Sequence, residues 1–397
     1  MTDFNGSGPT ALIIGCGIAG PTLAMFLQRA GITPVILEGR PAPADEVGAF
    51  LNLAPNGLAV LDLIGVKDAV LAAGTPTTRI AFLSPRGKQL GENPEMTTLI
   101  KRGRLNQVLR ESAIERGVRV EFGKRLVGVE TTADGVRAVF ADGSEVTGDL
   151  AVGCDGIHSR TRVSIMPHAP APRYTGVVDC GAFTRTSTVP PSDGLMQMTF
   201  GLNGFFGYQV LDDGEVYWFE NFTQEQEPDR AELEAVPAEE WRQRLLDLHR
   251  GDHAPIPEFI ASTTGGIGRW PIYDMPTLAS WHVGRVCLIG DSAHATSPHV
   301  GQGASMAMED AAELARCLRD LRDPAAAFAA FEHRRRDRVE KVVEQARKTG
   351  NQKAPSSSVG RFFRDLVLPV FLKRGVQETR WVYEHRIDWD ERADAPV

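Results

Sequence analysis

Apolar and polar residues follow a strand-helix-strand pattern at the start of the chain. Residues 11–14 form a short apolar run, and a segment with helical periodicity follows from Ile18 to Ala30. Gly31 stands at the expected helix end, and residues 34–37 form a second apolar run. This order predicts a βαβ unit.

Strand-like alternation dominates the middle of the chain. Between Val127 and Val152 the alternating segments are separated by Asp134-Gly135 and Asp142-Gly143, so we predict a β-meander. Alternation resumes from about Tyr174 to Trp281, with another such turn at Asp213-Gly214, and predicts an antiparallel sheet. Helical periodicity marks residues 58–63, 104–116, 238–249, 304–350 with a break at 323–324, and 360–385.

Composition narrows the class of protein. The chain carries 43 Lys and Arg against 51 Asp and Glu, and a net charge of −8 argues against nucleic acid as a partner. Five cysteines without a CxxC pair fit a reduced, cytoplasmic location. No apolar run is long enough to span a membrane, so we expect no stable membrane insertion. The pattern of residues 361–373 is also compatible with a helix that lies on a membrane surface, but we expect the apolar face of this helix to pack on the protein.

A glycine-rich loop follows the first apolar run. Gly15 permits a tight turn, Gly17 lets a pyrophosphate approach the backbone, and Gly20 lets the helix pack on the strand. Glu38 follows the second strand, where a carboxylate accepts hydrogen bonds from a ribose. Free N–H groups for the phosphates are expected at the helix start, with Ile18 and Ala19. The pattern predicts a dinucleotide site but does not separate NAD from FAD.

A second motif, Asp155-Gly156, ends an apolar run at residues 150–153. Asp-Gly is a very common turn dipeptide. Taken alone, this motif therefore leaves a plain turn and a ligand contact equally open.

The third motif, Gly290-Asp291, ends a strand predicted at residues 286–289. Ligands of open α/β sheets bind at the carboxyl ends of the strands, where Asp291 can hold the ribityl hydroxyls of FAD. Pro298 fixes a turn, and a long helix follows at Gly301, Gly303 and Ala304. A helix start stabilises the negative charge of a reduced flavin, so this motif favours FAD.

These motifs in this order resemble the class A flavoprotein monooxygenases with the p-hydroxybenzoate hydroxylase fold. The resemblance covers about residues 11–318, including the stretch from Gly290-Asp291-Ser-Ala-His294 to Glu309-Asp310. It implies that NAD(P)H binds transiently and reduces FAD. O2 then gives a C4a-peroxyflavin, which hydroxylates or epoxidises an aromatic or polyketide-like small molecule.

The resemblance also assigns individual residues. It implies that Asp155 and Gly156 contact both FAD and NAD(P)H, and that an arginine before a helix contacts the flavin region. Arg102 is favoured for that role, with Arg104 as the competing register. Arg40 is a candidate for the adenosine end, although Gly39 separates it from Glu38.

The fold class that follows is α/β. We predict a Rossmann-like FAD-binding domain with a β-meander, a second domain built on an antiparallel sheet, and a C-terminal helix. A chain of 397 residues exceeds the range of one hydrophobic core. The predicted limits are 1–173 and 282–350 for the two parts of the FAD-binding domain, 174–281 for the substrate domain, and 359–388 for the helical tail.

An apolar cavity over the flavin is expected, because the reactive intermediate must be kept from water. Candidates for its lining share large apolar or aromatic side chains: Phe50, Met196, Met198, Phe206, Tyr208, Trp218 and Pro298. Such residues at period two more often form the core of a sheet, so both placements stay open. Tyr208 and His299 are candidates for orienting a phenol, the flavin carries the chemistry, and no metal site is expected.

Three functions remain open at this point. The favoured one is a single-component monooxygenase that uses NAD(P)H and O2. An FAD-dependent dehydrogenase or oxidase on the same fold would insert no oxygen. A non-catalytic protein would bind FAD and sequester a ligand. For each of them we expect a monomer or a homodimer.

Overall fold

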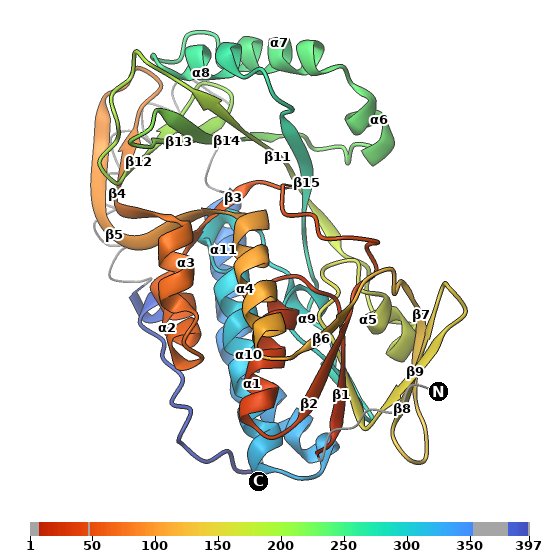
Figure 1. Ribbon diagram of the computed structural model, residues 1–397. Helices are drawn as coiled ribbons and strands as arrows, with labels where there is room; N and C mark the ends of the chain where they lie inside the picture. The colour runs from red at the N-terminus through yellow and green to blue at the C-terminus, as the bar shows by residue number, and fades with distance from the viewer. Residues whose placement is uncertain (1–7, 47, 352–379, 396–397) are drawn as a thin grey trace.

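The computed structural model describes residues 8–46, 48–351 and 380–395. Two bodies lie one above the other, each built on its own sheet (Figure 1). A six-stranded sheet lies at the centre of the lower body, and an eight-stranded sheet forms the upper body. The predicted helical tail at 359–388 falls mostly outside the described residues.

The lower body starts with the predicted βαβ unit, which the structure confirms. Its elements are β1 (Thr10–Ile14), α1 (Ala19–Arg29) and β2 (Thr33–Leu37), and β1 and β2 pair in parallel. Gly31 has φ of 77°, a conformation that glycine adopts without strain, and it follows the last turn of α1. The α/β class predicted from the sequence is therefore confirmed.

The six-stranded sheet runs in the order β16-β17-β10-β1-β2-β6, and β16 is its one antiparallel strand. The remaining strands are β6 (Arg119–Glu121), β10 (Leu150–Gly153), β16 (His282–Val283) and β17 (Val286–Leu288). The carboxyl ends of β1, β2, β10 and β17 meet at one edge of this sheet. Any ligand held by the residues that follow these strands must therefore lie along that edge.

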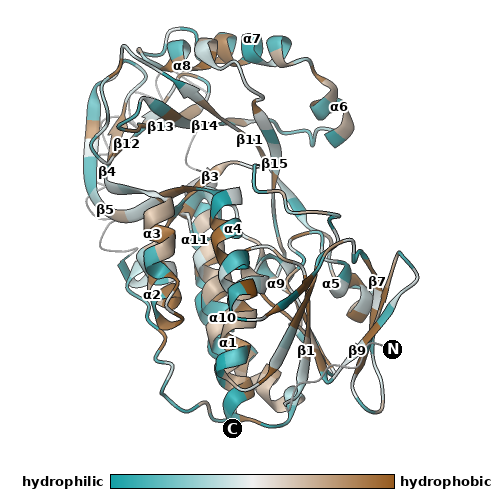
Figure 2. Ribbon diagram, in the orientation of Figure 1, coloured by the Kyte–Doolittle hydropathy of each residue, from teal (hydrophilic) through white to brown (hydrophobic). Residues whose placement is uncertain are grey.

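Helices cover one face of this sheet and the meander covers the other. The helical side contains α2 (Pro55–Leu63), α3 (Lys67–Ala73), α4 (Arg102–Glu115), α10 (Gly303–Asp320) and α11 (Pro324–Asn351). The other side contains β7 (Leu126–Thr131), β8 (Val136–Phe140), β9 (Glu145–Gly148) and α5 (Arg160–Ile165). Both faces of the sheet are buried, so its strands are continuous apolar runs rather than alternating ones (Figure 2).

The upper sheet has the order β15-β11-β14-β13-β12-β4-β5-β3. Five of its strands come from the alternating region: β11 (Arg173–Arg185), β12 (Leu195–Phe200), β13 (Phe205–Val210), β14 (Glu215–Thr223) and β15 (Gly268–Asp274). The other three are β3 (Phe50–Leu53), β4 (Thr75–Leu83) and β5 (Gln89–Lys101). These three come from the range that the sequence assigned to the first part of the FAD-binding domain.

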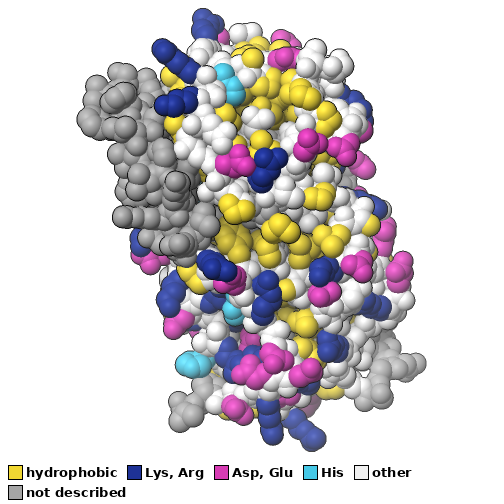
Figure 3. Space-filling model, turned by 90° about the vertical axis from the view of Figure 1, so that its left-hand side faces the viewer, with side chains coloured by type: hydrophobic (Ala, Val, Ile, Leu, Met, Phe, Trp, Pro, Cys, Tyr) yellow, Lys and Arg dark blue, Asp and Glu magenta, His cyan; other side chains and the backbone are white. Residues whose placement is uncertain are grey.

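Short helices cover the outer face of the upper sheet (Figure 1). They are α6 (Arg230–Ala235), α7 (Ala238–Leu248) and α8 (Ile256–Ser262). Side chains of α7 and α8 pack with the outward residues of the sheet in a second hydrophobic core. On the face that Figure 3 shows, hydrophobic side chains gather in the upper half and across the middle, and charged side chains of both signs are spread over the whole face.

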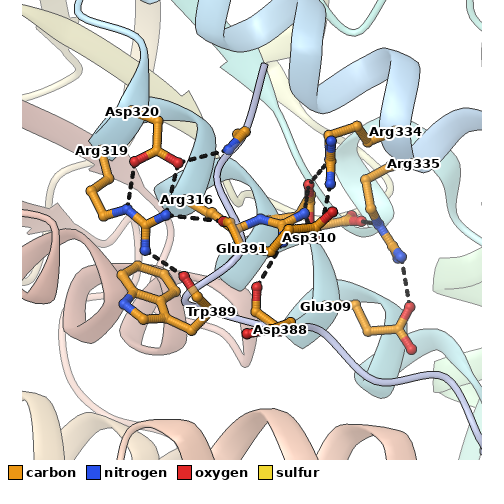
Figure 4. A network of polar contacts seen from close by, with 12 residues as sticks. Glu309, Asp310, Arg316, Arg319, Asp320, Arg334, Arg335, Asp388, Trp389 and Glu391 are labelled. Atoms are coloured by element: carbon orange, nitrogen blue, oxygen red, sulfur yellow. Dashed lines mark hydrogen bonds and ion pairs between the residues drawn. The ribbon is translucent and has the colours of Figure 1, made fainter. Parts of the chain in front are cut away.

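The C-terminal strap, residues 386–395, crosses the lower body and is held by arginines of α10 (Figure 4). Arg316 donates to the Asp388 carbonyl and to the Glu391 carboxylate, each at 2.7 Å. The Trp389 ring packs 5.3 Å from the ring of Phe26, on α1. The strap thus fixes α10 against α1.

A buried ionic cluster lies behind the upper sheet, where α7 ends. His249 Nδ1 lies 2.8 Å from Asp252 Oδ2, and His249 Nε2 lies 3.6 Å from Glu220 Oε1. Both His249 and Glu220 are fully buried. Burial opposes the charge of His249, but the hydrogen bond with Asp252 and the nearby carboxylate of Glu220 outweigh this effect and raise the pKa of His249 from 6.5 to about 9.

This cluster predicts a stability that depends on pH. The folded pKa of His249 lies above the unfolded value, so its contribution is complete below pH 6.5 and is lost as pH rises through about 9. We expect His249→Gln to be about 1–3 kcal/mol less stable than wild type at pH 6 and the gap to shrink by pH 9.5. Denaturant unfolding at both pH values measures this, with the exposed His333→Gln as control. A gap that stays constant with pH contradicts the charged form of His249.

Candidate functional site

A large cleft of about 2150 Å³ runs between the carboxyl edge of the lower sheet and the inner face of the upper sheet. The three sequence motifs meet at it. Pockets for a single small ligand usually measure about 300–1,000 Å³. The cleft therefore has room for a dinucleotide and a second molecule together.

The glycine loop shows why each glycine is needed. Gly15 has φ of 108°, and a Cβ there would lie 2.6 Å from the Cys154 carbonyl oxygen. A Cβ on Gly20 would lie 2.1 Å from the Gly15 carbonyl oxygen, so both positions exclude a side chain for packing reasons. At Gly17 a Cβ would meet nothing within 4 Å, because this residue faces open cleft. That openness is what a phosphate needs in order to reach the backbone.

Glu38 lies beside the loop at the end of β2. Its carboxylate accepts hydrogen bonds from the backbone N–H groups of Cys16 at 2.7 Å and Arg40 at 2.8 Å. Glu38 and Arg40 both line the cleft, as do Ile18 and Ala19 from the start of α1. The acid is thus held next to the phosphate-facing backbone, at the place where a ribose would follow.

The Asp155-Gly156 motif combines a turn with a cleft position. The Asp155 carboxylate accepts from the Ser159 hydroxyl at 2.6 Å and from the Thr161 N–H at 2.9 Å, which fixes the start of α5. Gly156 has φ of 76°, and both residues of the motif line the cleft. Arg162 donates to the Ser292 carbonyl at 2.8 Å and so joins this motif to the third one.

The third motif presents a carboxylate to the cleft. Asp291 begins the short helix α9 (Asp291–His294), lines the cleft, and has no hydrogen-bond or ion-pair partner among the residues that the structure describes. Gly290, with φ of 58°, is buried behind it and donates its N–H to Asp310 at 2.9 Å. Asp291 is therefore available for the hydroxyl groups of a ligand.

Asp310 is a buried carboxylate that fixes this third motif. It accepts from Gly290, from Arg335 Nε at 2.8 Å, and lies 2.6 Å from His294 Nε2. Burial opposes its ionisation, but His294 and Arg335 hold the pKa of Asp310 well below its ordinary value. His294, despite its place in the motif, points into this network and serves the fold.

The start of α10 faces the cleft as well. Pro298–Val300 forms a 3-10 turn, Gly301 has φ of 60°, and α10 begins at Gly303 without a side-chain cap. Pro298, Gly301, Gly303 and Ala304 all line the cleft. Uncapped N–H groups at this end favour negative charge in the cleft.

A polar network that the sequence reasoning missed supports the start of α10. Asn56 Nδ2 donates to Gln302 Oε1 at 2.9 Å and to Glu309 Oε1 at 2.7 Å. The buried Nε2 of Gln302 has no hydrogen-bond partner among the described residues, and Gln302 lines the cleft. A buried donor without a partner costs free energy, so a bound acceptor fits here. No sequence signal links Asn56 to a helix that starts so far along the chain.

Arg102 and Arg104 are separated by their positions on α4. Arg102 begins the helix, donates its backbone N–H to the Ala49 carbonyl at 2.9 Å, and lines the cleft. Arg104 is exposed, contacts Gln107, and does not line the cleft. Arg102, which was favoured over Arg104, is therefore the arginine that lines the cleft.

Of the residues predicted to line a cavity over the flavin, only some lie at the cleft. Phe50, Met198, Pro298 and His299 line the cleft, and Met196 is fully buried beneath the same face of the upper sheet. Gly20 and Gly290, among the predicted cofactor residues, lie just behind the lining.

Phe206, Tyr208 and Trp218 lie on the opposite face of the upper sheet, in the core against α7 and α8. Tyr208 contacts Phe259 there, and burial raises the pKa of its phenol well above the ordinary value. The cause is strand alternation, since neighbouring residues point to opposite faces. Several other large rings of the upper sheet line the cleft, and five of them, which we call the aromatic wall, are Phe82, Phe200, Phe205, Phe219 and Trp270.

No group of three or more potential metal ligands occurs within the described ranges. No helix in those ranges is long and apolar enough to cross a membrane. The site is therefore defined by its phosphate-facing loop, its carboxylates and its aromatic wall.

Four of these features fit FAD. They are the open backbone at Gly17, the Glu38 carboxylate at the place expected for a ribose, the Asp291 carboxylate without a partner among the described residues, and the start of α10 without a side-chain cap. They define a flavoprotein of the hydroxylase type. Residues 9–346 match the FAD binding domain family, and the chain belongs to this family. It is an FAD-dependent monooxygenase, as its named relatives are.

The relatives support this membership over most of their length. The chain is 35% identical over 355 residues to aurachin C monooxygenase/isomerase of Stigmatella aurantiaca, covering 87% of this chain and 89% of that protein. It is 32% identical to the FAD-dependent urate hydroxylase of Klebsiella pneumoniae, covering 85% and 88%. The structure of Klebsiella pneumoniae HpxO complexed with FAD and uric acid superposes with a TM-score of 0.85 at 26% identity, over 96% and 98% of the two chains.

Asp291→Ala tests the third motif. We expect FAD to bind more weakly by about 1.5–3 kcal/mol, because the ligand hydroxyls lose a charged acceptor. Fluorescence titration of the apoprotein with FAD measures the change, and the exposed Asp337→Ala on α11 is the matched control. An Asp291→Ala protein that retains FAD as tightly as the control would show that this carboxylate does not hold the cofactor.

Gly17→Ala tests the loop without disturbing the fold. The added methyl group meets no protein atom within 4 Å, so the apoprotein should keep its melting temperature while losing at least about tenfold in FAD affinity. Gly265→Ala, which is equally unobstructed, is the control and should change neither quantity. Equal FAD affinity in both variants contradicts a phosphate at Gly17.

Proposed function

We propose that this chain is a single-component hydroxylase that consumes NAD(P)H and O2 and adds one oxygen atom to an aromatic or polyketide-like small molecule. The observation that carries the proposal is the composition of the cleft. One side presents the FAD-binding residues, and the other presents the aromatic wall. A protein that only stored a flavin would need the first side alone.

The residues of the chain have distinct tasks in this proposal. Gly17 and the start of α1 bind the pyrophosphate, Glu38 binds a ribose, and Asp291 binds the ribityl chain. The start of α10 stabilises negative charge on the cofactor. Bound FAD supplies electron acceptance from NAD(P)H and the activation of O2. The aromatic wall keeps water from the reacting atoms.

NAD(P)H is proposed as a transient co-substrate. The sequence carries one glycine loop of the dinucleotide-binding type, at Gly15–Gly20, and this loop suits the resident cofactor. A second nucleotide would enter the same cleft, which is large enough for more than one molecule. Asp155 and Gly156, at the cleft surface, are the proposed contact for both.

The thiols are proposed to be inert in a reduced, cytoplasmic setting. All five cysteines are buried and form no disulfide. Burial raises the pKa of Cys16 to about 12, and Glu38 adds to this effect. Cys16 lies in the glycine loop, so a protonated thiol there leaves the phosphate site without an added negative charge. We propose a monomer or a homodimer as the functional state.

Isotope tracing tests the reaction. With NAD(P)H and a turned-over aromatic compound, we expect 18O from 18O2 in the product and none from labelled water, measured by mass spectrometry. Substrate should also stimulate NAD(P)H oxidation. Oxidised product without label points instead to a dehydrogenase or oxidase. A flavin that stays oxidised under NAD(P)H and ligand points to a sequestering protein.

A further inference from the structure

Polar side chains interrupt the inner face of the upper sheet where β3, β4 and β5 meet. On β3, Asn52 lies on the same side of the strand as Phe50, which lines the cleft. On β5, Thr97 lies on the same side as Leu99, the residue that pairs with Asn52. Thr97 is in turn paired with Thr77 on β4. Paired residues share a face of the sheet, so Asn52, Thr77 and Thr97 lie on one face.

The surroundings of these polar residues are apolar. Leu99, Met196 and Tyr217 form a hydrophobic cluster, and Phe50 and Ile80 pack against it. A polar group buried among such side chains costs free energy unless a hydrogen bond compensates for the loss of water. Each polar group at this place therefore needs a partner, either in the protein or in a ligand.

Thr77 and Gln209 find their partners within the protein. Thr77 is fully buried and Gln209 is 1% exposed. Gln209 Nε2 donates to the Pro76 carbonyl at 3.1 Å, so Gln209 Oε1 is the atom that faces the Thr77 hydroxyl, at 2.8 Å. The same hydroxyl lies 3.1 Å from Asn52 Oδ1. Its one proton is thus shared between two amide oxygens, and this contact fixes the orientation of Asn52.

Asn52 and Thr97 keep hydrogen-bonding groups that the protein does not use. Asn52 is half-buried and lines the cleft, and its Nδ2 has no hydrogen-bond partner among the described residues. Thr97 is only 7% exposed and also lines the cleft, and its buried Oγ1 has no partner in the described parts of the chain. Diagonal neighbours on paired strands lie roughly 7–8 Å apart, a separation that one ligand oxygen can bridge.

The position of Asn52 and Thr97 relates them to the cofactor end of the cleft. β3 leads directly into α2, and Asn56 of α2 donates to Gln302 at the start of α10. The start of α10 is the part of the cleft that favours negative charge on a flavin. A ligand held by Asn52 and Thr97 is therefore kept close to the cofactor, where a substrate has to react.

From this arrangement we propose that Asn52 and Thr97 determine substrate specificity by binding the ring carbonyl of an uncharged aromatic compound. Asn52 Nδ2 and the Thr97 hydroxyl each donate a hydrogen bond to this oxygen, which has two lone pairs. Thr77 and Gln209 are positioning residues that hold the Asn52 amide. None of the four side chains is charged, so the subsite suits a neutral acceptor. This assignment rests on the proposed function of the chain as an aromatic hydroxylase.

Three bicyclic probes of similar size test the subsite on the FAD-loaded enzyme. Chromone offers a ring carbonyl, indole offers an N–H donor, and naphthalene offers neither. Equilibrium dialysis without NAD(P)H gives the dissociation constants, so the measurement needs no turnover. Wild type should bind chromone at least about fivefold more tightly than naphthalene or indole, because two hydrogen bonds are gained. Chromone that binds no more tightly than naphthalene, or not at all, overturns the proposal.

Asn52→Asp replaces the donor nitrogen with an oxygen at nearly unchanged size. We expect the affinity for chromone to fall at least about tenfold relative to naphthalene, and the affinity for indole to rise, because a carboxylate only accepts hydrogen bonds. Asn52→Leu removes the amide without adding a charge and should lower the affinity for chromone alone. FAD content and melting temperature are measured for both variants, so a folding defect in one of them does not decide the result.

Thr97→Val tests the second donor, because valine replaces the hydroxyl with a methyl group of similar size. The ratio of chromone to naphthalene affinity should fall at least about threefold. Two exposed positions outside the cleft supply matched controls, Asn203→Asp and Thr147→Val on β9, and both should keep the wild-type ratios.

The outcomes separate this inference from the proposed function. Wild-type ratios in folded, FAD-loaded Asn52 and Thr97 variants overturn the subsite, even if the enzyme hydroxylates another aromatic compound. Shifted ratios support the subsite, even if 18O tracing shows that no oxygen is inserted, in which case only the proposed reaction fails.

Discussion

The whole site depends on one geometrical constraint: parallel strands of a sheet end at the same edge. β1, β2, β10 and β17 pair in parallel, so the residues that follow them are brought together from distant parts of the chain. Those residues are the glycine loop, Glu38, Asp155 and Asp291. Each contributes little alone, and the shared edge makes them one elongated surface on which a dinucleotide can lie.

Buried ion pairs keep this edge in register with the helices beneath it. Arg335 on α11 reaches both Glu309 and Asp310, and these carboxylates in turn hold Asn56 and the Gly290 backbone. Burying such charges is costly unless every partner is present. Removing one partner would leave a buried charge uncompensated and would shift the start of α10 along with Asp291. The cluster thus links the long helices to the cofactor edge.

Local signals in the sequence predicted part of the fold, from the start of the chain to the long C-terminal helices. The βαβ unit, the meander with its Asp-Gly turns, and the break at Pro324 all arise from short-range patterns, and the structure confirms them. The cleft positions of Gly17, Glu38 and Asp291 also follow from motif and strand order, whereas that of Arg102 was expected from the family resemblance. These cases share one property, which is that neighbouring residues carry the information.

The composition of the upper sheet and the faces of its strands could not be predicted, because they depend on pairing between distant parts of the chain. Nothing near residues 50–101 indicates that β3, β4 and β5 join strands from the other half of the chain. Alternation alone could not tell Phe205 from Phe206, because a shift of one residue exchanges the two faces of a strand. The placement of Phe206 and Trp218 in the cleft was therefore wrong by one position. Their neighbours Phe205 and Phe219 are the residues that line the cleft.

The absorbance spectrum of the purified wild-type protein tests the central claim most directly. If the converging strand ends hold FAD, the protein should show flavin absorption bands as isolated, or gain them with one equivalent of added FAD after gel filtration. A protein that is colourless as isolated, and still colourless after incubation with FAD, would contradict the account.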